Sequence, residues 1–293
     1  MRIIETTAKG ILTRSKLPDA DYVVNPYTGC AFACEYCYAS FMGKWVGEPI
    51  ESWGDYVYVK TNAVELFEKE ITSLKEQSRQ SSILLSSVTD AWQGVEKKYR
   101  LARGILQILV REKYPGVVSI LTKSPLILED KDSLVALPNP EVGITITSTD
   151  DKVSRLFERK APLASRRIKT LAALNAAGLP TYAFVGPLFP HFRFRPELLD
   201  TLFRQIAEAG TRDVYVELIN LSQYIRKRLD AVMKEADPAL ASAYATADES
   251  EHRKALEQIV NELIEKHHLT LRLGDVIDHR KDAKIPVVGG ATQ

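Results

Sequence analysis

Short β-branched runs alternate with longer amphipathic segments along most of this 293-residue chain, and this alternation restricts its fold more than any other feature. The sequence predicts strands at Tyr22–Asn25, Ser82–Val88, Val117–Thr122, Val142–Thr147, Thr181–Val185 and Val214–Leu218. Helical spacing predicts helices at Asn62–Gln77, Val95–Glu112, Pro125–Leu137, Ser165–Ala177 and Pro196–Ala209. Alternation on this scale favours an α/β fold with a parallel sheet and right-handed crossovers. About six βα units indicate a partial (β/α)6 barrel of the TIM type, with a doubly wound open sheet as the alternative.

The chain divides into three parts by sequence pattern. Residues 1–20 form an N-terminal arm, residues 21–236 the core barrel, and residues 237–293 a C-terminal part. Within the last part, Asp237–Ser250 is rich in Ala, Ser and Asp and is predicted as a linker or weak helix, followed by a helix at Glu251–His267. The tail Ile285–Gln293 is predicted to be flexible. The barrel therefore carries a C-terminal helical extension.

The charge balance and the hydropathy pattern narrow the possible partners. The chain has 39 basic and 38 acidic residues and a net charge of +1, so its composition does not indicate a protein dominated by phosphate contacts. There is no signal-peptide pattern, and no apolar run approaches the roughly 18–20 residues of a membrane span. We therefore expect a cytoplasmic protein without a membrane partner.

All the cysteines of the chain lie within eight residues. Cys30, Cys34 and Cys37 have C-x3-C-x2-C spacing on a loop that follows the first predicted strand. Three clustered cysteines are a poor disulfide framework and indicate a metal site. Three thiolates on one loop can bind three irons of a 4Fe-4S cubane and leave the fourth iron without a protein ligand. An open iron of this kind can bind the amino and carboxylate groups of S-adenosylmethionine (SAM).

Two simpler explanations of these cysteines compete with the cluster. A structural zinc site needs a fourth ligand, and the chain has no fourth cysteine. Its five histidines lie far along the chain, at His191, His252, His267, His268 and His279. The other explanation is that the cysteines are ordinary buried residues. The spacing favours the cluster over both.

Several motifs, in order and at consistent spacing, carry a resemblance to a known family. The first is GCAFACEYCYA around the cysteines, and the second is Ser87-Val88-Thr89-Asp90 with Gln93-Gly94-Val95-Glu96 behind it. The others are Leu121–Pro125, Gly143–Thr147, Phe157–Pro162 with Arg166-Arg167, and Gly186–Pro190. Between about Val24 and Pro190 the sequence resembles the radical SAM superfamily, and within it the spore photoproduct lyase-like (DNA repair photolyase-like) group.

The resemblance implies a function and a set of site residues. It makes residues 21–236 a radical SAM core barrel whose 4Fe-4S cluster is held by the three cysteines. It implies an enzyme that cleaves SAM reductively to a 5′-deoxyadenosyl radical, with an external electron donor such as a flavodoxin or ferredoxin. Tyr36 is expected to present an aromatic face beside the cluster. Residues matching the SAM site of the family are Ser87, Thr89, Asp90, Lys123 and Thr145. Asp90 is also a candidate helix N-cap, and Lys123 a candidate surface lysine.

The chain departs from its namesake at one position. Spore photoproduct lyase uses an additional cysteine, just before its own Ser-Asp pair, as a hydrogen-atom donor, and here Ser87 stands at the matching place. The O–H bond of serine is too strong to replace that thiol. Tyr38 matches a tyrosine of the family's radical relay and is the candidate donor, with core packing as its other explanation.

Other candidates concern the substrate. Lys152–Lys169 is rich in basic residues and is either an anion clamp at the barrel mouth or a solvated helix face. His191–Arg195 interleaves aromatic and basic side chains and either stacks a nucleobase or caps the barrel. The substrate is therefore a nucleic-acid base or nucleotide by family resemblance, or else a small metabolite or peptide. A non-enzymatic iron–sulfur carrier and a zinc-stabilised nucleic-acid-binding module are the competing classes.

Overall fold

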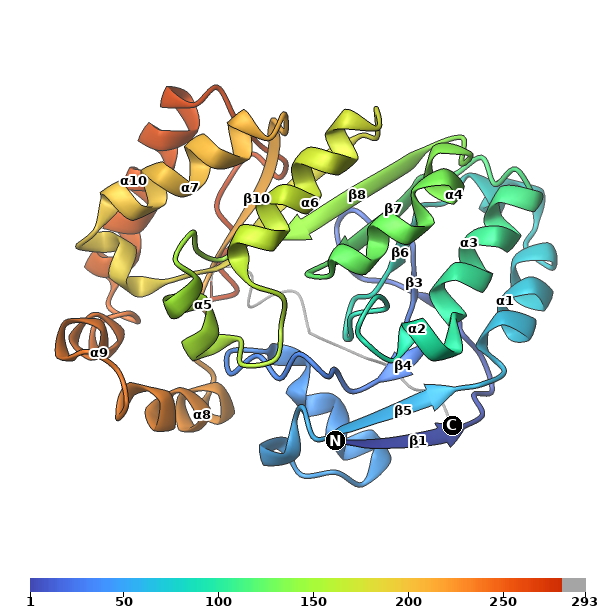
Figure 1. Ribbon diagram of the computed structural model, residues 1–293, viewed down its shortest axis with the longest axis horizontal. Coiled ribbons are helices and arrows are strands. Elements are labelled where there is room, and N and C mark those ends of the chain that lie inside the picture. Colours follow the sequence, from blue (N-terminus) through green and yellow to red (C-terminus); the bar gives the residue numbers. More distant parts are fainter. Residues whose placement is uncertain (281–293) are drawn as a thin grey trace.

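The main sheet is an open barrel of parallel strands. The computed structural model describes residues 1–280, and the predicted tail Ile285–Gln293 lies outside them. Six parallel strands lie side by side in the order of the chain: β3 (Tyr22–Val24), β6 (Ile83–Leu85), β7 (Val118–Thr122), β8 (Pro140–Thr145), β9 (Thr181–Leu188) and β10 (Asp213–Leu218). At the edges, β2 (Leu12–Arg14) pairs antiparallel with β3, and β11 (Thr270–Leu271) pairs parallel with β10. The edges do not pair in the described residues, so the (β/α)6 barrel is partial, as predicted (Figure 1).

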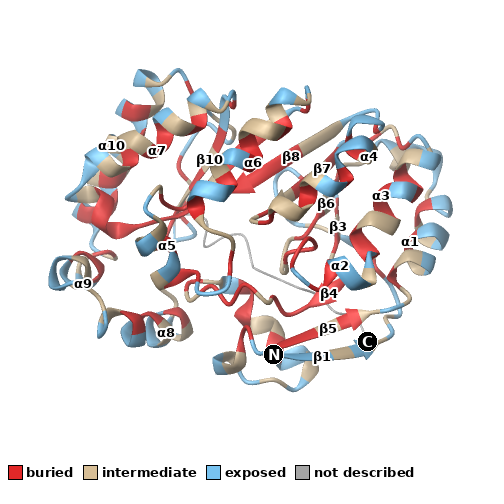
Figure 2. Cartoon of the chain, viewed as in Figure 1, coloured by how far each residue is buried: buried red, intermediate tan, exposed pale blue. Residues whose placement is uncertain are grey.

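Helices follow the strands and cover the outside of the sheet (Figure 1). The helices in the part of the chain before β10 are α1 (Ala63–Thr72), α2 (Glu96–Tyr99), α3 (Leu101–Arg111), α4 (Lys131–Val135), α5 (Asp151–Phe157), α6 (Ala164–Ala176) and α7 (Pro196–Glu208). The same part contains the 3-10 turns η3 (Glu76–Gln80), η4 (Pro125–Asp130) and η5 (Pro190–Arg193). The strands and the inward helix faces are buried, and the outward helix faces are exposed (Figure 2). This distribution follows from the 3.6-residue hydrophobic period of the helices.

Two predicted helices end or break earlier than their hydrophobic spacing indicates. The helix predicted over Asn62–Gln77 ends at Thr72, where the hydroxyls of Thr72 and Ser73 donate to backbone carbonyls of the preceding turn. The helix predicted over Val95–Glu112 breaks at Arg100, whose backbone is left-handed with φ of 53°. The carboxylate of Glu96 then accepts hydrogen bonds from the first backbone amides of the next helix, which starts α3.

A small side sheet lies beside the barrel and was not predicted. It consists of β1 (Arg2–Thr6), β5 (Tyr56–Lys60) and β4 (Tyr27–Thr28), with β5 in the centre. Tyr56, Val57 and Val59 of the central strand are buried. The cysteine loop follows β4 directly and is continued by the 3-10 segments η1 (Tyr38–Val46) and η2 (Ile50–Ser52). The side sheet therefore fixes the start of that loop.

The chain after β10 contains more helix than predicted. The segment predicted as a linker or weak helix holds α9 (Pro238–Ala245), which Asp237 caps by accepting a hydrogen bond from the Ala239 amide at 2.7 Å. Before it lies an unpredicted helix, α8 (Gln223–Met233), and after it lies α10 (Ser250–Lys266), the predicted terminal helix. No helix in residues 1–280 combines the length and the apolar character that crossing a bilayer requires.

Candidate functional site

The cysteine loop lies across the segments that leave the C-terminal ends of β6 and β8. On the β6 side, the Ala31 amide donates to Gln93 Oε1 at 2.7 Å, and Gln93 Nε2 donates to the Gly29 carbonyl at 3.2 Å. On the β8 side, the Glu35 amide donates to the Phe157 carbonyl at 2.8 Å. The ends of parallel strands are where barrel enzymes place their active sites. The fold therefore puts the three cysteines at the barrel mouth.

The three thiols are free, close together and poorly solvated. Cys30 and Cys34 are buried and Cys37 is half-buried. Burial raises the pKa of all three: to about 12 for Cys34, and well above the usual range for Cys30. Other cysteines of the loop also raise the pKa of Cys30 and Cys34, and Lys123 opposes the shift for Cys34 and Cys37. Thiolates at this place need nearby positive charge, which bound iron supplies.

The three cysteines also form a donor set of the kind that holds an iron–sulfur cluster. In the described part of the chain, no group of three or more His, Cys, Asp or Glu side chains could hold a metal ion. A cubane instead takes one thiolate per iron, so its ligands need not converge on one centre. The donor set of three free thiols on one loop, two buried and one half-buried, therefore fits a 4Fe-4S cluster.

The segment after β6 carries three of the residues expected to bind SAM. The Thr89 hydroxyl donates to the Gly29 carbonyl at 2.6 Å, so it helps to hold the cysteine loop. The buried Asp90 carboxylate accepts from Thr122 Oγ1 at 2.7 Å and from the Lys123 amide at 2.8 Å, and burial raises its pKa. Asp90 also accepts from the Trp92 amide at 2.9 Å, as a cap would. Ser87 is held by the side chain of Asn25. These side chains thus hold the segments at the barrel mouth in place through hydrogen bonds within the protein.

Lys123 and Thr145 end neighbouring strands. Lys123 Nζ lies 5.7 Å from the centre of the Tyr36 ring and makes no hydrogen bond or ion pair with any residue in 1–280. Burial acts to lower the pKa of Lys123, but the nearby Cys34 and Glu158 raise it by more. The lysine is therefore charged and half-buried, not a solvated surface residue. Thr145 is buried at the end of β8, and its carbonyl accepts from Arg167 at 3.4 Å.

A buried ion pair that the sequence did not reveal lies behind the cysteine loop. Arg167 binds Glu158 through two bonds of 3.0 and 2.5 Å, and both side chains are fully buried. Glu158 also accepts from the hydroxyls of Tyr36, Thr147 and Ser154. Burial alone would raise the pKa of Glu158, but Arg167 holds it at about 2. The pair fixes the Tyr36 ring that faces Lys123. In the sequence, both partners of this ion pair belong to the motif Phe157–Pro162 with Arg166-Arg167, but nothing there indicates that they pair.

The family resemblance makes Tyr38 a candidate hydrogen-atom donor, and the structure places it beside Ser87. Its hydroxyl donates to the backbone carbonyl of Ser87, and its side chain is partly exposed. Burial, the nearby Cys37 and Glu217 raise its pKa, so the phenol stays protonated. The structure thus brings Tyr38 and Ser87 together, although they are far apart in the chain.

The two basic candidates for substrate binding are only partly available. In Lys152–Lys169, Arg167 belongs to the buried ion pair, and Arg159 binds Glu35 at 3.1 Å. In His191–Arg195, the first two rings, His191 and Phe192, are buried, whereas Phe194 is 57% exposed. The first half of that segment therefore caps the barrel, and its second half faces outward.

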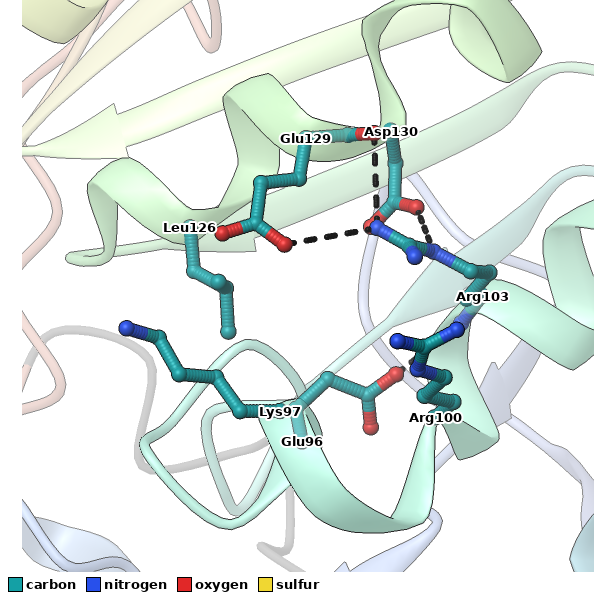
Figure 3. A pocket seen from close by; sticks show the side chains of 7 residues that line it. All are labelled: Glu96, Lys97, Arg100, Arg103, Leu126, Glu129 and Asp130. Atoms are coloured by element: carbon teal, nitrogen blue, oxygen red, sulfur yellow. Dashed lines mark hydrogen bonds and ion pairs between the residues drawn. The ribbon is translucent and has the colours of Figure 1, made fainter.

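Two cavities lie beside this mouth. One, of about 170 Å³, is drawn in Figure 3 and lies between the helices that follow β6 and β7. Its lining combines three cations with three anions: Glu96, Lys97, Arg100, Arg103, Glu129 and Asp130, with Leu126 at one side. The second, of about 230 Å³, lies at the end of β10 and is lined by residues 218–222 together with Asp248, Arg253, His279 and Arg280. Neither cavity includes a cysteine or a residue expected to bind SAM.

Helix α8 also contacts the cysteine loop. Arg228 of α8 donates to the Cys34 carbonyl at 3.1 Å and pairs with Glu35 at 3.3 Å. Nothing in the local sequence around Arg228 marks it, because its partners lie more than 190 residues earlier in the chain.

Comparisons with known proteins agree with this site. The sequence pattern described as the radical SAM superfamily matches residues 24–203. An uncharacterized protein of Methanocaldococcus jannaschii is 35% identical over 223 residues, which cover 75% of this chain and 79% of that relative. An uncharacterized protein of Mycobacterium tuberculosis is 29% identical over 270 residues, covering 87% and 78%.

Among solved structures, the fold is similar to that of spore photoproduct lyase complexed with dinucleoside spore photoproduct. The TM-score is 0.67 at 17% identity, with 92% of this chain and 81% of the other covered. The family match covers most of the barrel, including the cysteine loop and the strand ends that face it. The chain therefore belongs to the radical SAM superfamily and is a radical SAM enzyme with a fold like that of spore photoproduct lyase.

Proposed function

We propose that Cys30, Cys34 and Cys37 hold a 4Fe-4S cluster whose open iron binds SAM, and that the substrate is a nucleobase or nucleotide. When bound, the cluster and SAM together supply one-electron cleavage of a C–S bond to a 5′-deoxyadenosyl radical, which abstracts hydrogen from the substrate. The observation that carries the proposal is the uncommitted ammonium of Lys123 near the Cys34 and Cys37 thiols at the strand ends.

The residues of the chain divide into those that bind and those that position. Lys123 would hold the SAM carboxylate through a charge-assisted hydrogen bond. The Tyr36 ring, fixed by Glu158, would exclude water from one side of the ammonium. Asp90 and Thr89 would contribute mainly by holding the Lys123 backbone and the Gly29 carbonyl in place. Ser87 and Thr145 would present polar groups to the methionine or ribose part of SAM.

Anaerobic reconstitution tests the cofactor proposal. The purified protein should bind iron and sulfide in a ratio near that of a cubane. With a reductant it should release 5′-deoxyadenosine from SAM. A protein that binds the cluster but leaves SAM intact would be an iron–sulfur carrier, and one that binds only zinc would be the nucleic-acid-binding module. Either result would contradict the proposal. A flavodoxin or ferredoxin should replace the chemical reductant.

The nucleic-acid part of the proposal rests on the fold and on the position of Tyr38. The solved structure with a similar fold holds a dinucleoside lesion, and Tyr38 lies at the mouth beside Ser87. The net charge of +1 favours the second candidate, a small metabolite or peptide.

Dinucleoside spore photoproduct distinguishes these substrates. The wild-type protein should not return it cleanly to thymine, because Ser87 offers no thiol to quench the product radical. If the mouth accepts a thymine lesion, Ser87→Cys should increase the clean product, measured by mass spectrometry. Clean multiple turnover by the wild type would contradict the prediction that clean repair needs a thiol donor. No effect of Ser87→Cys would favour a metabolite or peptide.

A further inference from the structure

Arg228 joins α8 to the cysteine loop itself by hydrogen bonds and an ion pair. Its guanidinium is nearly buried, with the side chain 8% exposed. The NH2 group donates to the Cys34 carbonyl at 3.1 Å and to Glu35 at 3.3 Å, and Nε donates to Glu35 at 3.4 Å. One side of the guanidinium is thus fully used to hold the loop.

The other side of the same guanidinium has no partner. The NH1 group is buried and makes no hydrogen bond to any residue in 1–280. A buried N–H group without an acceptor costs roughly 1–3 kcal/mol, and more when the group is charged, so such groups require an explanation. Arg228 is also one of the charges that act on the Cys37 thiol. The guanidinium that carries the unpaired group is also bonded to the backbone of Cys34, a proposed ligand of the cluster.

The surrounding contacts hold α8 in place. Tyr224 donates to the Tyr38 carbonyl at 3.2 Å, and Lys227 pairs with Glu51 at 2.9 Å. With Arg228, these residues place three successive contacts of one helix on the cysteine loop and the segment that follows it. A guanidinium held along one side in this way can keep the two N–H donors of its other side directed at one acceptor.

We propose that Arg228 is a positioning residue for the iron–sulfur cluster, whose unpaired NH1 group would donate a hydrogen bond to a sulfide of the bound cluster. This inference rests on the proposed cluster. Hydrogen bonds to the sulfurs and nearby positive charge stabilise the reduced, more negative cluster and so raise its reduction potential. Helix α8 would thereby set how readily the cluster accepts an electron.

Potentiometric titration of the reconstituted protein, followed by electron paramagnetic resonance, tests this role without relying on turnover. Arg228→Met should lower the reduction potential and speed the loss of iron to a chelator. Arg228→Lys keeps a charge but loses the fork of donors, and should fall between Arg228→Met and the wild type. Lys227→Ala is the matched control on the same helix, because its exposed pair with Glu51 lies away from the cysteines, and its potential should equal that of the wild type.

Glu35→Gln separates positioning of the cluster from simple support of the loop. It breaks the ion pair of Arg228 but leaves NH1, and it removes a negative charge near the cluster. The potential should therefore stay or rise, opposite to the effect of Arg228→Met. If both variants lowered the potential equally, Arg228 would only support the loop and the proposal would be wrong.

The folded state of each variant is checked by circular dichroism. A folded Arg228→Met protein with the wild-type potential and wild-type iron retention would also overturn the inference. If Arg228→Met does not fold, Arg228→Gln takes its place under the same criterion. If the wild type itself binds no iron and sulfide, the proposed function has failed instead, so the two failures are distinguishable.

Discussion

The two halves of the barrel mouth are built differently. In the half formed by the ends of β6, β7 and β8, buried polar groups are bound by other protein groups: Asp90 by the end of β7, and Glu158 by Arg167 and three hydroxyls. In the half formed by β10 and the C-terminal part, the strand end opens into a cavity of about 230 Å³. That half is fastened by a second buried pair, Arg253 with Asp278, at 2.5 Å.

The difference shows where the fold demands precision. A cofactor site requires groups held within a fraction of an ångström, and hydrogen-bond networks among buried polar residues provide this. A substrate site on the same scaffold changes with the added segments that close it. The β6–β8 half therefore has the ordered polar groups that a cofactor site requires, whereas the strand end of the β10 half is open.

The largest expected effect removes the cofactor from the first half. Replacing Cys30, Cys34 and Cys37 together with alanine should abolish binding of iron and sulfide. The barrel should remain folded, because the loop lies at its mouth rather than among the strands. Metal and sulfide analysis beside circular dichroism measures both. Stoichiometric iron and sulfide in the triple variant would refute the assignment of the ligands.

The second effect concerns the stability of the first half. Glu158→Gln should destabilise the apo protein by about 3–5 kcal/mol, because it leaves the Arg167 charge buried and unpaired. Adding Arg167→Met should restore part of that loss. Denaturation by urea measures the change.

The control for this pair is the exposed pair of α7, Arg204 with Glu208 at 2.9 Å. Glu208→Gln should cost no more than about 0.5 kcal/mol. If Glu158→Gln were equally mild, the first half of the mouth would not depend on its buried network.

The third effect is on SAM itself. Lys123→Ala should weaken SAM binding to the reconstituted protein by about 1.5–3 kcal/mol, the contribution of a hydrogen bond to a charged group. Isothermal titration calorimetry under anaerobic conditions measures it. Lys97→Ala, on the lining of the cavity in Figure 3, is the control and should bind SAM normally. Unchanged affinity in Lys123→Ala would leave the half-buried lysine without a role in binding.

The smallest effect tests the β10 half through pH. Burial acts to raise the pKa of Asp278, but Arg253 and Arg280 lower it by more, so it lies below its usual range in the fold. A carboxyl with a depressed pKa contributes stability above its unfolded pKa of about 3.9, and this contribution is lost as pH falls through the folded value. Hydrogen exchange of α10 should therefore accelerate below about pH 4, and Asp278→Asn should flatten this dependence. If hydrogen exchange accelerated below about pH 4 equally in the variant, the acceleration would come from carboxyl groups other than Asp278.

The sequence could predict the barrel because its signals are local. Hydrophobic period identified the six strands, and helix caps such as Ser124 with Pro125 are visible in a few residues. The side sheet escaped because β5 pairs with strands 30 and more residues earlier, and its own run, Tyr56–Lys60, is short. The left-handed Arg100 that divides one predicted helix had no local signal either.

For the site, the sequence by itself determined the chemistry: three cysteines at fixed spacing, with Ser87 and not a thiol at the position of the family's hydrogen donor. Covalent spacing along a loop is a property of the chain, so it can be read without a fold. Only the tertiary structure decided which polar groups are free and which are committed. In the structure, Lys123 Nζ has no polar partner in residues 1–280, whereas Thr89 and Asp90 are hydrogen-bonded to other protein groups. Glu158 is buried with Arg167, and Arg228 contacts the Cys34 carbonyl. The physical reason is that burial and hydrogen-bond partnership depend on contacts between segments far apart in the chain, which no local pattern encodes.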